Sequence, residues 1–375
     1  MGKAHFEVID NVTLISDLIK YGAASGLKLV VGEMETGDVR VEKVGGKSTV
    51  TRCFCRYPLK FIIPRKAGSV KTDSVWIYSL TYGGGIVSGD AISCGLYVGD
   101  GCTTVLTTQA STKVYKSLGS KCSEQLLEAE IGSEAILVVI PDPVTCFSTA
   151  RYSQKQVFRV VSDSSLVLVD WITSGRHESG EIWDFDLYRS TNNIFLGDGQ
   201  PLFLDTVEFW SGLKQSNILM LFNRSWLIEN LPCKFKIFPV FAISLNLNGN
   251  RQQVLLEKGA IAPLAESMQT YRVIAMIVIF GTKLGHIQKR IQEDVKRMMS
   301  EQIQVSSNSF SHKKKPNSLY ISPDKLSFIA SCSSFGQKEV GLVVRIASRT
   351  TESVYSFLRG QLAGLEPLIG LPPYC

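Results

Sequence analysis

Apolar and polar residues alternate along much of the first two thirds of the chain, which is the pattern of β-strands with one buried face. In one clear run, every second residue is apolar and its neighbours are small or polar: Ile92, Cys94, Leu96 and Val98. The turn-forming sequence Gly99-Asp100-Gly101 follows, and residues 103–108 are rich in β-branched side chains. Because a short glycine-containing turn joins the two runs, the pattern predicts a β-hairpin.

This strand–turn–strand pattern recurs at intervals of about 30 residues. Its three copies begin at Val98, Ile131 and Val161. Repetition at this period is typical of stacked structural units, although ordinary hairpin sequences also resemble one another. Each second strand runs into polar residues, which are Gln109, Asp142 and Asp170 in chain order. If the units stack, we expect these polar strand ends to lie along one side of the protein.

Two later segments have the periodicity of amphipathic helices. The first covers residues 285–303 and the second covers residues 351–365, where Thr350 or Thr351 is a suitable N-cap. The apolar run at residues 273–280 predicts a buried strand. The fold class that follows is mainly β, with stacked β-sheets or hairpin units and two α-helices. No proline- or serine-rich linker divides the chain convincingly, so we predict a single domain over residues 1–375.

Composition and charge restrict the function further. The net charge is +6, but the basic residues are scattered, and the one basic cluster, at residues 312–315, has the composition of a solvated loop. We therefore expect no nucleic-acid partner. An odd number of cysteines, nine in 375 residues, indicates free thiols in a reducing compartment. With no targeting segment evident and no apolar run long enough to span a bilayer, we expect a cytoplasmic protein without a membrane partner.

A glycine-rich stretch at residues 83–90 is the most distinctive local sequence. A nucleotide P-loop needs Lys and Ser or Thr after its last glycine, whereas Asp90-Ala91 follows here, and the strand pattern after Asp90 excludes the helix of a dinucleotide site. Two interpretations remain. Either Asp90 caps backbone amides in a tight turn, or the structural glycines Gly84, Gly85 and Gly89 hold its carboxylate where another segment passes closely.

A second polar segment, residues 174–183, follows the predicted strand that ends near Asp170. It lacks the second histidine of a zinc-protease helix, and its glycines disfavour a helix. Arg176 is either salt-bridged to nearby acids, or it joins Asp170 and Glu181 in one polar cluster, where an arginine keeps carboxylates ionised. The pair Cys53 and Cys55 has no further Cys or His nearby, so we expect no stable metal site.

These motifs together resemble one family, that of urease accessory protein D (UreD, also called UreH). Gly84-Gly-Ile-Val-Ser-Gly-Asp90 is similar to its Gly-Gly-hydrophobic-Val-x-Gly-Asp signature, and residues 112–117 are similar to its Thr-Lys-x-Tyr-Arg-Ser segment, with Lys116 in place of the usual Arg. Further motifs follow in the family's order and spacing: Pro141-Asp-Pro143, Tyr152-x-Gln154, Gly175-Arg176, Gly180-Glu181-x-Trp183, Val344-Arg-Ile-Ala347 and Leu358-Arg359. The similarity covers about residues 50–370, and the sequence predicts a loop insertion at about 304–325.

The resemblance implies a urease maturation factor with no catalytic residues and no tightly bound cofactor. Its expected partners are apo-urease, urease accessory protein F and the urease accessory GTPase G, and its expected cargo is transient nickel(II). The family is thought to contain a water-filled passage for the metal. Matching the motifs places the passage residues at Asp90, Thr112, Asp170, Arg176, Glu181 and Asp205.

Two alternatives from other classes stay open on the sequence. One is a hydrolase or isomerase that uses Asp90 or Glu181 as acid and base, which requires a closed pocket and a carboxyl group with a raised pKa. The other is a β-rich interaction module with no polar interior.

Overall fold

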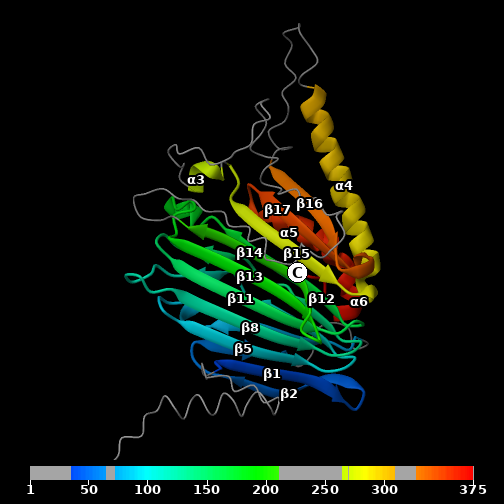
Figure 1. Ribbon diagram of the computed structural model, residues 1–375. Helices are drawn as coiled ribbons and strands as arrows, with labels where there is room; N and C mark the ends of the chain where they lie inside the picture. Colours follow the sequence, from blue (N-terminus) through cyan, green and yellow to red (C-terminus); the bar gives the residue numbers. More distant parts are fainter. Residues whose placement is uncertain (1–34, 65–71, 211–263, 269, 309–326, 375) are drawn as a thin grey trace, which may run out of the picture. The chain divides into compact units, whose positions relative to one another are not determined.

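The computed structural model describes residues 35–64, 72–210, 264–268, 270–308 and 327–374, and the described residues from Thr36 onward form one compact unit. Its described residues are mainly strands arranged in two sheets (Figure 1). The mainly β fold class with two longer helices is therefore confirmed. Whether residues 1–375 form a single domain stays a prediction.

The first sheet has seven described strands, in which five central parallel strands are flanked by an antiparallel strand at each edge. In spatial order they are β14 (Pro201–Trp210), β13 (Leu187–Leu196), β11 (Arg151–Val160), β8 (Ser123–Ile131), β5 (Ala91–Val98), β1 (Gly37–Val44) and β2 (Lys47–Cys55).

The second sheet has ten described strands, of which two short ones lie off the main order. The main order is β16 (Phe328–Phe335), β17 (Gly341–Ser348), β15 (Val273–Phe280), β12 (Ser165–Thr173), β9 (Ile136–Val139), β6 (Thr103–Thr108), β4 (Val75–Thr81) and β3 (Leu59–Ile62). The short strands β10 (Val144–Cys146) and β7 (Thr112–Val114) extend it beside β12.

The repeated units stack as predicted, but they are not hairpins. β5, β8 and β11 are parallel neighbours in the first sheet, and β6, β9 and β12 are parallel neighbours in the second. Each polar turn therefore carries the chain from one sheet to the other. Neighbouring turns are joined by hydrogen bonds, as where the Ser133 backbone amide donates to Asp100 and the Ser133 hydroxyl donates to Asp163.

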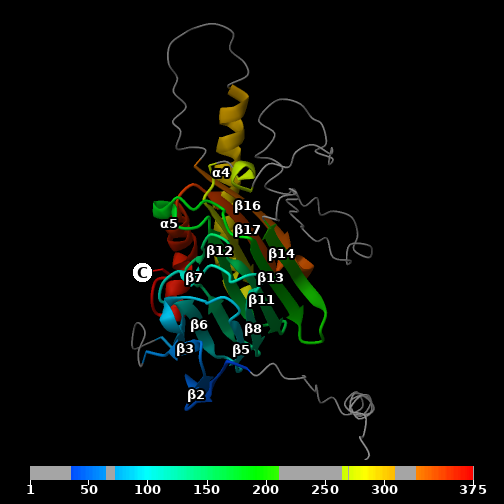
Figure 2. The same cartoon turned by 90° about the vertical axis from the view of Figure 1, so that its left-hand side faces the viewer.

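The burial of the strands explains why the two strands of a unit belong to different sheets. All nine residues of β12 are buried, because one face packs on the first sheet and the other on the helices. Leu166 and Leu168 point toward the first sheet, whereas Val167, Val169 and Trp171 belong to the core under the helices. Figure 2 shows this layering of helices, second sheet and first sheet. A strand that is apolar on both faces is typical of such a covered sheet.

The helices agree with the sequence pattern. α4 (Gly285–Asn308) runs five residues beyond the predicted end at 303, and α5 (Thr351–Leu362) continues into a 3₁₀ turn over residues 363–365. Thr350 is the N-cap of α5, with its side chain accepting a hydrogen bond from the Ser353 amide. Two helices of four residues, α3 (Leu264–Ser267) and α6 (Glu366–Ile369), complete the described set. Of the predicted insertion, residues 304–308 belong to α4 and residues 309–325 lie outside the described part.

Candidate functional site

A buried carboxylate, Asp170 of β12, lies between the two sheets and is 9% exposed. It accepts three hydrogen bonds from the first sheet, from Gln154 Nε2 at 2.7 Å, from Asn192 Nδ2 at 2.7 Å and from the Ser190 hydroxyl. Gln154 comes from β11, and Ser190 and Asn192 come from β13. Asp170 therefore connects the two sheets through polar contacts in a region where the neighbouring positions are apolar.

The alternation along β12 explains this placement. Leu166, Leu168 and Asp170 are spaced by two residues, so all three point toward the first sheet. Burial raises the pKa of Asp170 above its usual range, the three hydrogen bonds oppose that shift, and the nearby charge of Asp205 adds to it. A buried carboxylate without partners is strongly disfavoured, so these donors are what keep Asp170 in place.

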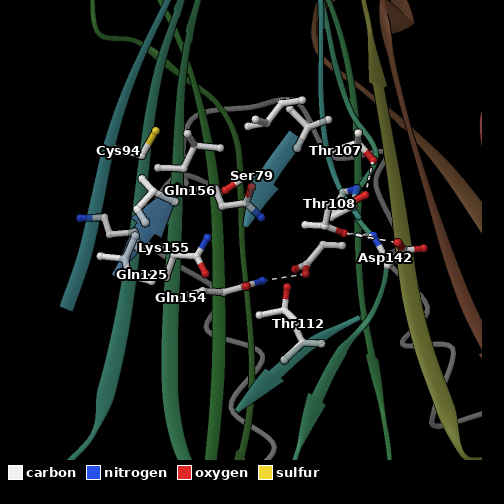
Figure 3. A pocket seen from close by; sticks show the side chains of 18 of the residues that line it. Ser79, Cys94, Thr107, Thr108, Thr112, Gln125, Asp142, Gln154, Lys155 and Gln156 are labelled. Atoms are coloured by element: carbon white, nitrogen blue, oxygen red, sulfur yellow. Dashed lines mark hydrogen bonds between the residues drawn. The ribbon is translucent and has the colours of Figure 1, made fainter. Parts of the chain in front are cut away.

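A cavity of about 80 Å³ adjoins Asp170 between the sheets. Figure 3 shows Gln154 and Gln125 reaching into it from one side, with Thr112, Thr108 and Asp142 facing them. A single water needs about 10–15 Å³ of such volume, so several waters fit beside these polar groups. The expectation that polar strand ends gather on one side is met by Asp142 and Asp170, whereas Gln109 does not line this cavity.

Polar side chains continue from Asp170 on the side away from Thr112. In the first sheet, Asn192 is paired with Asp205 of β14, and in the second sheet Asp170, Met276 and Arg345 occupy neighbouring register positions on β12, β15 and β17. Arg345 donates to Asp205 Oδ1 at 2.7 Å, whereas Asp205 Oδ2 is buried and has no hydrogen-bond partner among the described residues. We call Gln154, Asp170, Ser190, Asn192, Asp205 and Arg345 the inter-sheet polar layer.

Arg176 and Glu181 form a separate ion pair. Arg176 donates to both carboxylate oxygens of Glu181, its Nε at 3.0 Å from Oε2, and its guanidinium lies 4.0 Å from the centre of the Phe147 ring. The Arg176 hydrogen bond lowers the pKa of Glu181. The hypothesis of one cluster containing Asp170, Arg176 and Glu181 is therefore wrong at the level of direct contacts, because the Asp170 carboxylate bonds to Gln154, Ser190 and Asn192 instead.

The glycine-rich stretch forms a turn in which Asp90 acts as a cap. Asp90 Oδ2 accepts a hydrogen bond from the Val87 amide at 2.9 Å. Gly89, which lies between these two residues in the chain, has a positive φ. A Cβ on Gly85 would lie 2.7 Å from the Lys113 carbonyl oxygen, so this position requires a glycine where the segment passes β7. Both interpretations of the stretch hold locally, but Asp90 does not line the cavity next to Asp170.

The six predicted passage residues thus fall into four places. Thr112 and Asp170 line the same cavity, Asp205 belongs to the polar layer beyond it, Arg176 pairs with Glu181, and Asp90 caps its turn. Ser190, Asn192 and Arg345 are partners of these carboxylates that the sequence did not predict. A signal was present, since Ser190 and Asn192 are polar at alternate positions of a strand whose other inward residues, Tyr188 and Ile194, are apolar and buried.

Among the described residues, no group of three or more His, Cys, Asp or Glu side chains is placed to hold a metal ion. Carboxylate oxygens of Asp170 and Asp205 are the anionic groups that the polar layer offers to a cation. None of the described helices combines the length and the apolar character needed to cross a membrane.

The known proteins to which this chain is similar are urease accessory proteins of one family. The family model described as UreD urease accessory protein matches residues 35–227. Urease accessory protein D of Arabidopsis thaliana is 57% identical over 343 residues, which cover 91% of this chain and all of that protein. Urease accessory protein D of Oryza sativa subsp. japonica is 48% identical over 90% of this chain and 94% of its own length. Urease accessory protein UreD of Anaeromyxobacter sp. (strain Fw109-5) is 27% identical over 90% of this chain and 88% of its own length.

Proposed function

Because the chain belongs to the UreD urease accessory protein family and so has a role in urease maturation, we propose that it is a scaffold between apo-urease and the other accessory proteins and a conduit for nickel(II). The observation that carries the conduit is the polar interior between two sheets that are otherwise packed by apolar side chains. An interior of this kind costs stability, so its presence favours a functional purpose over a purely structural one.

The ligand atoms of this interior suit a nickel(II) ion that binds only transiently. Nickel(II) accepts oxygen ligands, and the cavity and polar layer offer carboxylates, amide oxygens and hydroxyls at intervals. A compact thiolate site would bind the ion far more tightly. The described cysteines nearest this region are single thiols, such as Cys94 at the cavity wall and the buried Cys146. Spaced oxygen ligands therefore favour stepwise movement over storage.

The acid–base alternative has less support. It requires a carboxyl group with a raised pKa near Asp90 or Glu181, whereas Arg176 lowers the pKa of Glu181 and Asp90 is engaged in capping its turn. Asp170 has a raised pKa, but three donors from the opposite sheet hold its carboxylate, and it is neither of the two residues on which this alternative rests. We therefore assign the chain a non-catalytic role in maturation.

The proposed partners are apo-urease, urease accessory protein F and the GTPase G, and the proposed setting is the cytoplasm. The seven described cysteines form no disulfide bond with one another, in keeping with a reducing compartment. We propose that nickel(II) is handed on transiently and that no cofactor is held permanently.

Co-purification tests the scaffold role. When the tagged full chain is co-expressed with apo-urease and accessory proteins F and G, we expect all three to be recovered with it and nickel-free urease to suffice for binding. A Glu208→Gln chain, altered at an exposed pair on the outer face of β13 and β14, should recover the same set. Recovery of neither apo-urease nor protein F by the folded wild-type chain would count against the scaffold.

A further inference from the structure

The ion pair between Arg345 and Asp205 uses a single carboxylate oxygen, in contrast to the ion pairs of Arg189 and Arg176. Arg189 binds Glu208 through two parallel hydrogen bonds of 3.2 and 3.0 Å, and Arg176 binds both oxygens of Glu181. Such two-pronged pairing is the usual strong geometry. Arg345, in contrast, bonds only to Asp205 Oδ1, and its other terminal nitrogen lies 3.9 Å from the Met276 sulfur.

The second oxygen of Asp205 is therefore the unusual atom of this site. The Asp205 side chain is 6% exposed, and Oδ2 is buried without a hydrogen-bond partner among the described residues. A buried carboxylate oxygen without a donor is costly, and proteins rarely leave one so. Asp205 is paired with Asn192, whose amide binds Asp170, so Asp205 Oδ2 is an unused acceptor within the inter-sheet polar layer.

The charges of the inter-sheet polar layer explain why an arginine belongs there. The layer contains two carboxylates, Asp170 and Asp205, and one guanidinium, Arg345. Without the guanidinium, two buried negative charges would match the charge of a divalent cation and hold it firmly. With Arg345 in place, the cation meets only one uncompensated negative charge, and it must compete with the guanidinium for Asp205.

The charged group of Arg345 can also move away from Asp205 toward solvent. Its side chain is 26% exposed, in contrast to that of Asp205, and it extends from β17, beyond which the described part of the sheet has one further strand, β16. A long, flexible side chain of this kind can move its charged group to solvent while its stem stays packed. The guanidinium can therefore leave Asp205 without a rearrangement of either sheet.

We propose that Arg345 is a place-holding cation, which neutralises Asp205 in the metal-free chain, yields it to a passing divalent cation and then displaces that cation by returning. This inference rests on the proposed conduit function and adds its regulation. Arg345 is then a positioning residue that sets how briefly the cation stays, and Asp205 Oδ2 is the acceptor kept open for it.

Nickel binding to the purified full chain tests this role without urease. In equilibrium dialysis against nickel chloride in a non-chelating buffer, Arg345→Met is expected to bind nickel with a Kd about ten-fold lower than the wild type. Arg345→Lys, which keeps the charge, should behave as the wild type, and Arg189→Met should leave the Kd unchanged. Adding Asp205→Asn to Arg345→Met should abolish the gain.

A folded Arg345→Met chain with the wild-type Kd would overturn the proposal, and so would a gain that survives Asp205→Asn. If Arg345→Met does not fold, as judged by circular dichroism, Arg345→Gln takes its place with the same expected outcome. Failure of the conduit itself is a separate result. It would appear as full nickel loading of urease by an Asp170→Asn chain, whatever the nickel affinity of the Arg345 variants.

Discussion

Truncation of Trp171 to alanine is expected to lower the free energy of unfolding by about 4 kcal/mol, in the range for large aromatic side chains removed from a core. Trp171 is 2% exposed on the helix-facing side of β12. Its indole nitrogen donates to the Pro141 carbonyl at 2.8 Å, and its ring packs edge-on against Tyr355, with centroids 4.8 Å apart. The change therefore removes packing and a hydrogen bond at the point where α5 meets the second sheet.

Urea unfolding followed by circular dichroism measures this loss. Trp171→Phe is the matched control, because it keeps an aromatic ring but lacks the donor to Pro141, so it should recover all but about 1–2 kcal/mol. Pro141 and Asp142 line the cavity, and the Tyr355 hydroxyl binds Asp142 at 2.7 Å. A loss below about 1 kcal/mol for Trp171→Ala would show that this junction does not anchor the helix layer.

Removal of the Asp170 side chain by Asp170→Ala is expected to cost about 3 kcal/mol of unfolding free energy, because Gln154, Ser190 and Asn192 would keep buried donors with no acceptor. The loss should depend on pH. Burial raises the pKa of Asp170 in the folded chain, whereas an unfolded aspartate has a pKa of about 3.9. Its contribution to stability is therefore fully present below the unfolded value and declines as the pH rises through the folded value.

The cost of Asp170→Ala should accordingly be larger at pH 5 than at pH 7.5, in urea titrations of both chains. Asp170→Asn keeps the volume without the titration, and the wild type should likewise gain on it as the pH falls. Equal losses at both pH values for both variants would mean that burial does not raise the pKa of the Asp170 carboxyl into this pH range.

Much of the fold was predictable because burial imposes a period on the sequence. The stripe of Ile287, Ile291 and Val295 predicted α4, and all three residues are buried in the core below it. The unbroken apolar run of Val273–Phe280 predicted β15 as a buried strand. The sequence predicts Thr350 or Thr351 as the N-cap of α5, and Thr350 takes this role, because its hydroxyl accepts a hydrogen bond from an amide that the helix leaves free.

The hairpin prediction failed because a tight polar turn fits both a hairpin and a corner between sheets. The distinguishing feature lay in the strands themselves. β8 alternates between buried and exposed positions along its latter half, from Leu127 to Ile131, whereas the four residues of β9 that follow are all buried. Strands of one hairpin share the same two environments, so such a change of pattern across a turn indicates a change of sheet.

The candidate site was only partly accessible from the sequence. Asp170 stood out as an acid after an apolar strand, and the matched family motifs added Thr112 and Asp205. The partners of these residues lie 16 to 140 positions away along the chain, as for Gln154 with Asp170 and Arg345 with Asp205. Nothing in the local sequence reports such pairings, because they arise from the register of strands in two different sheets.

The central claim is that nickel(II) passes between the two sheets beside Asp170. Its most direct test is the nickel content of urease, measured by mass spectrometry after reconstitution with accessory proteins F and G and either the wild-type or the Asp170→Asn chain. We expect the Asn chain to assemble the same complex but to load urease with about one tenth of the nickel or less, as expected when a charged ligand is lost from the route. Full loading by an assembled Asp170→Asn complex would contradict the conduit and leave this chain as a scaffold alone.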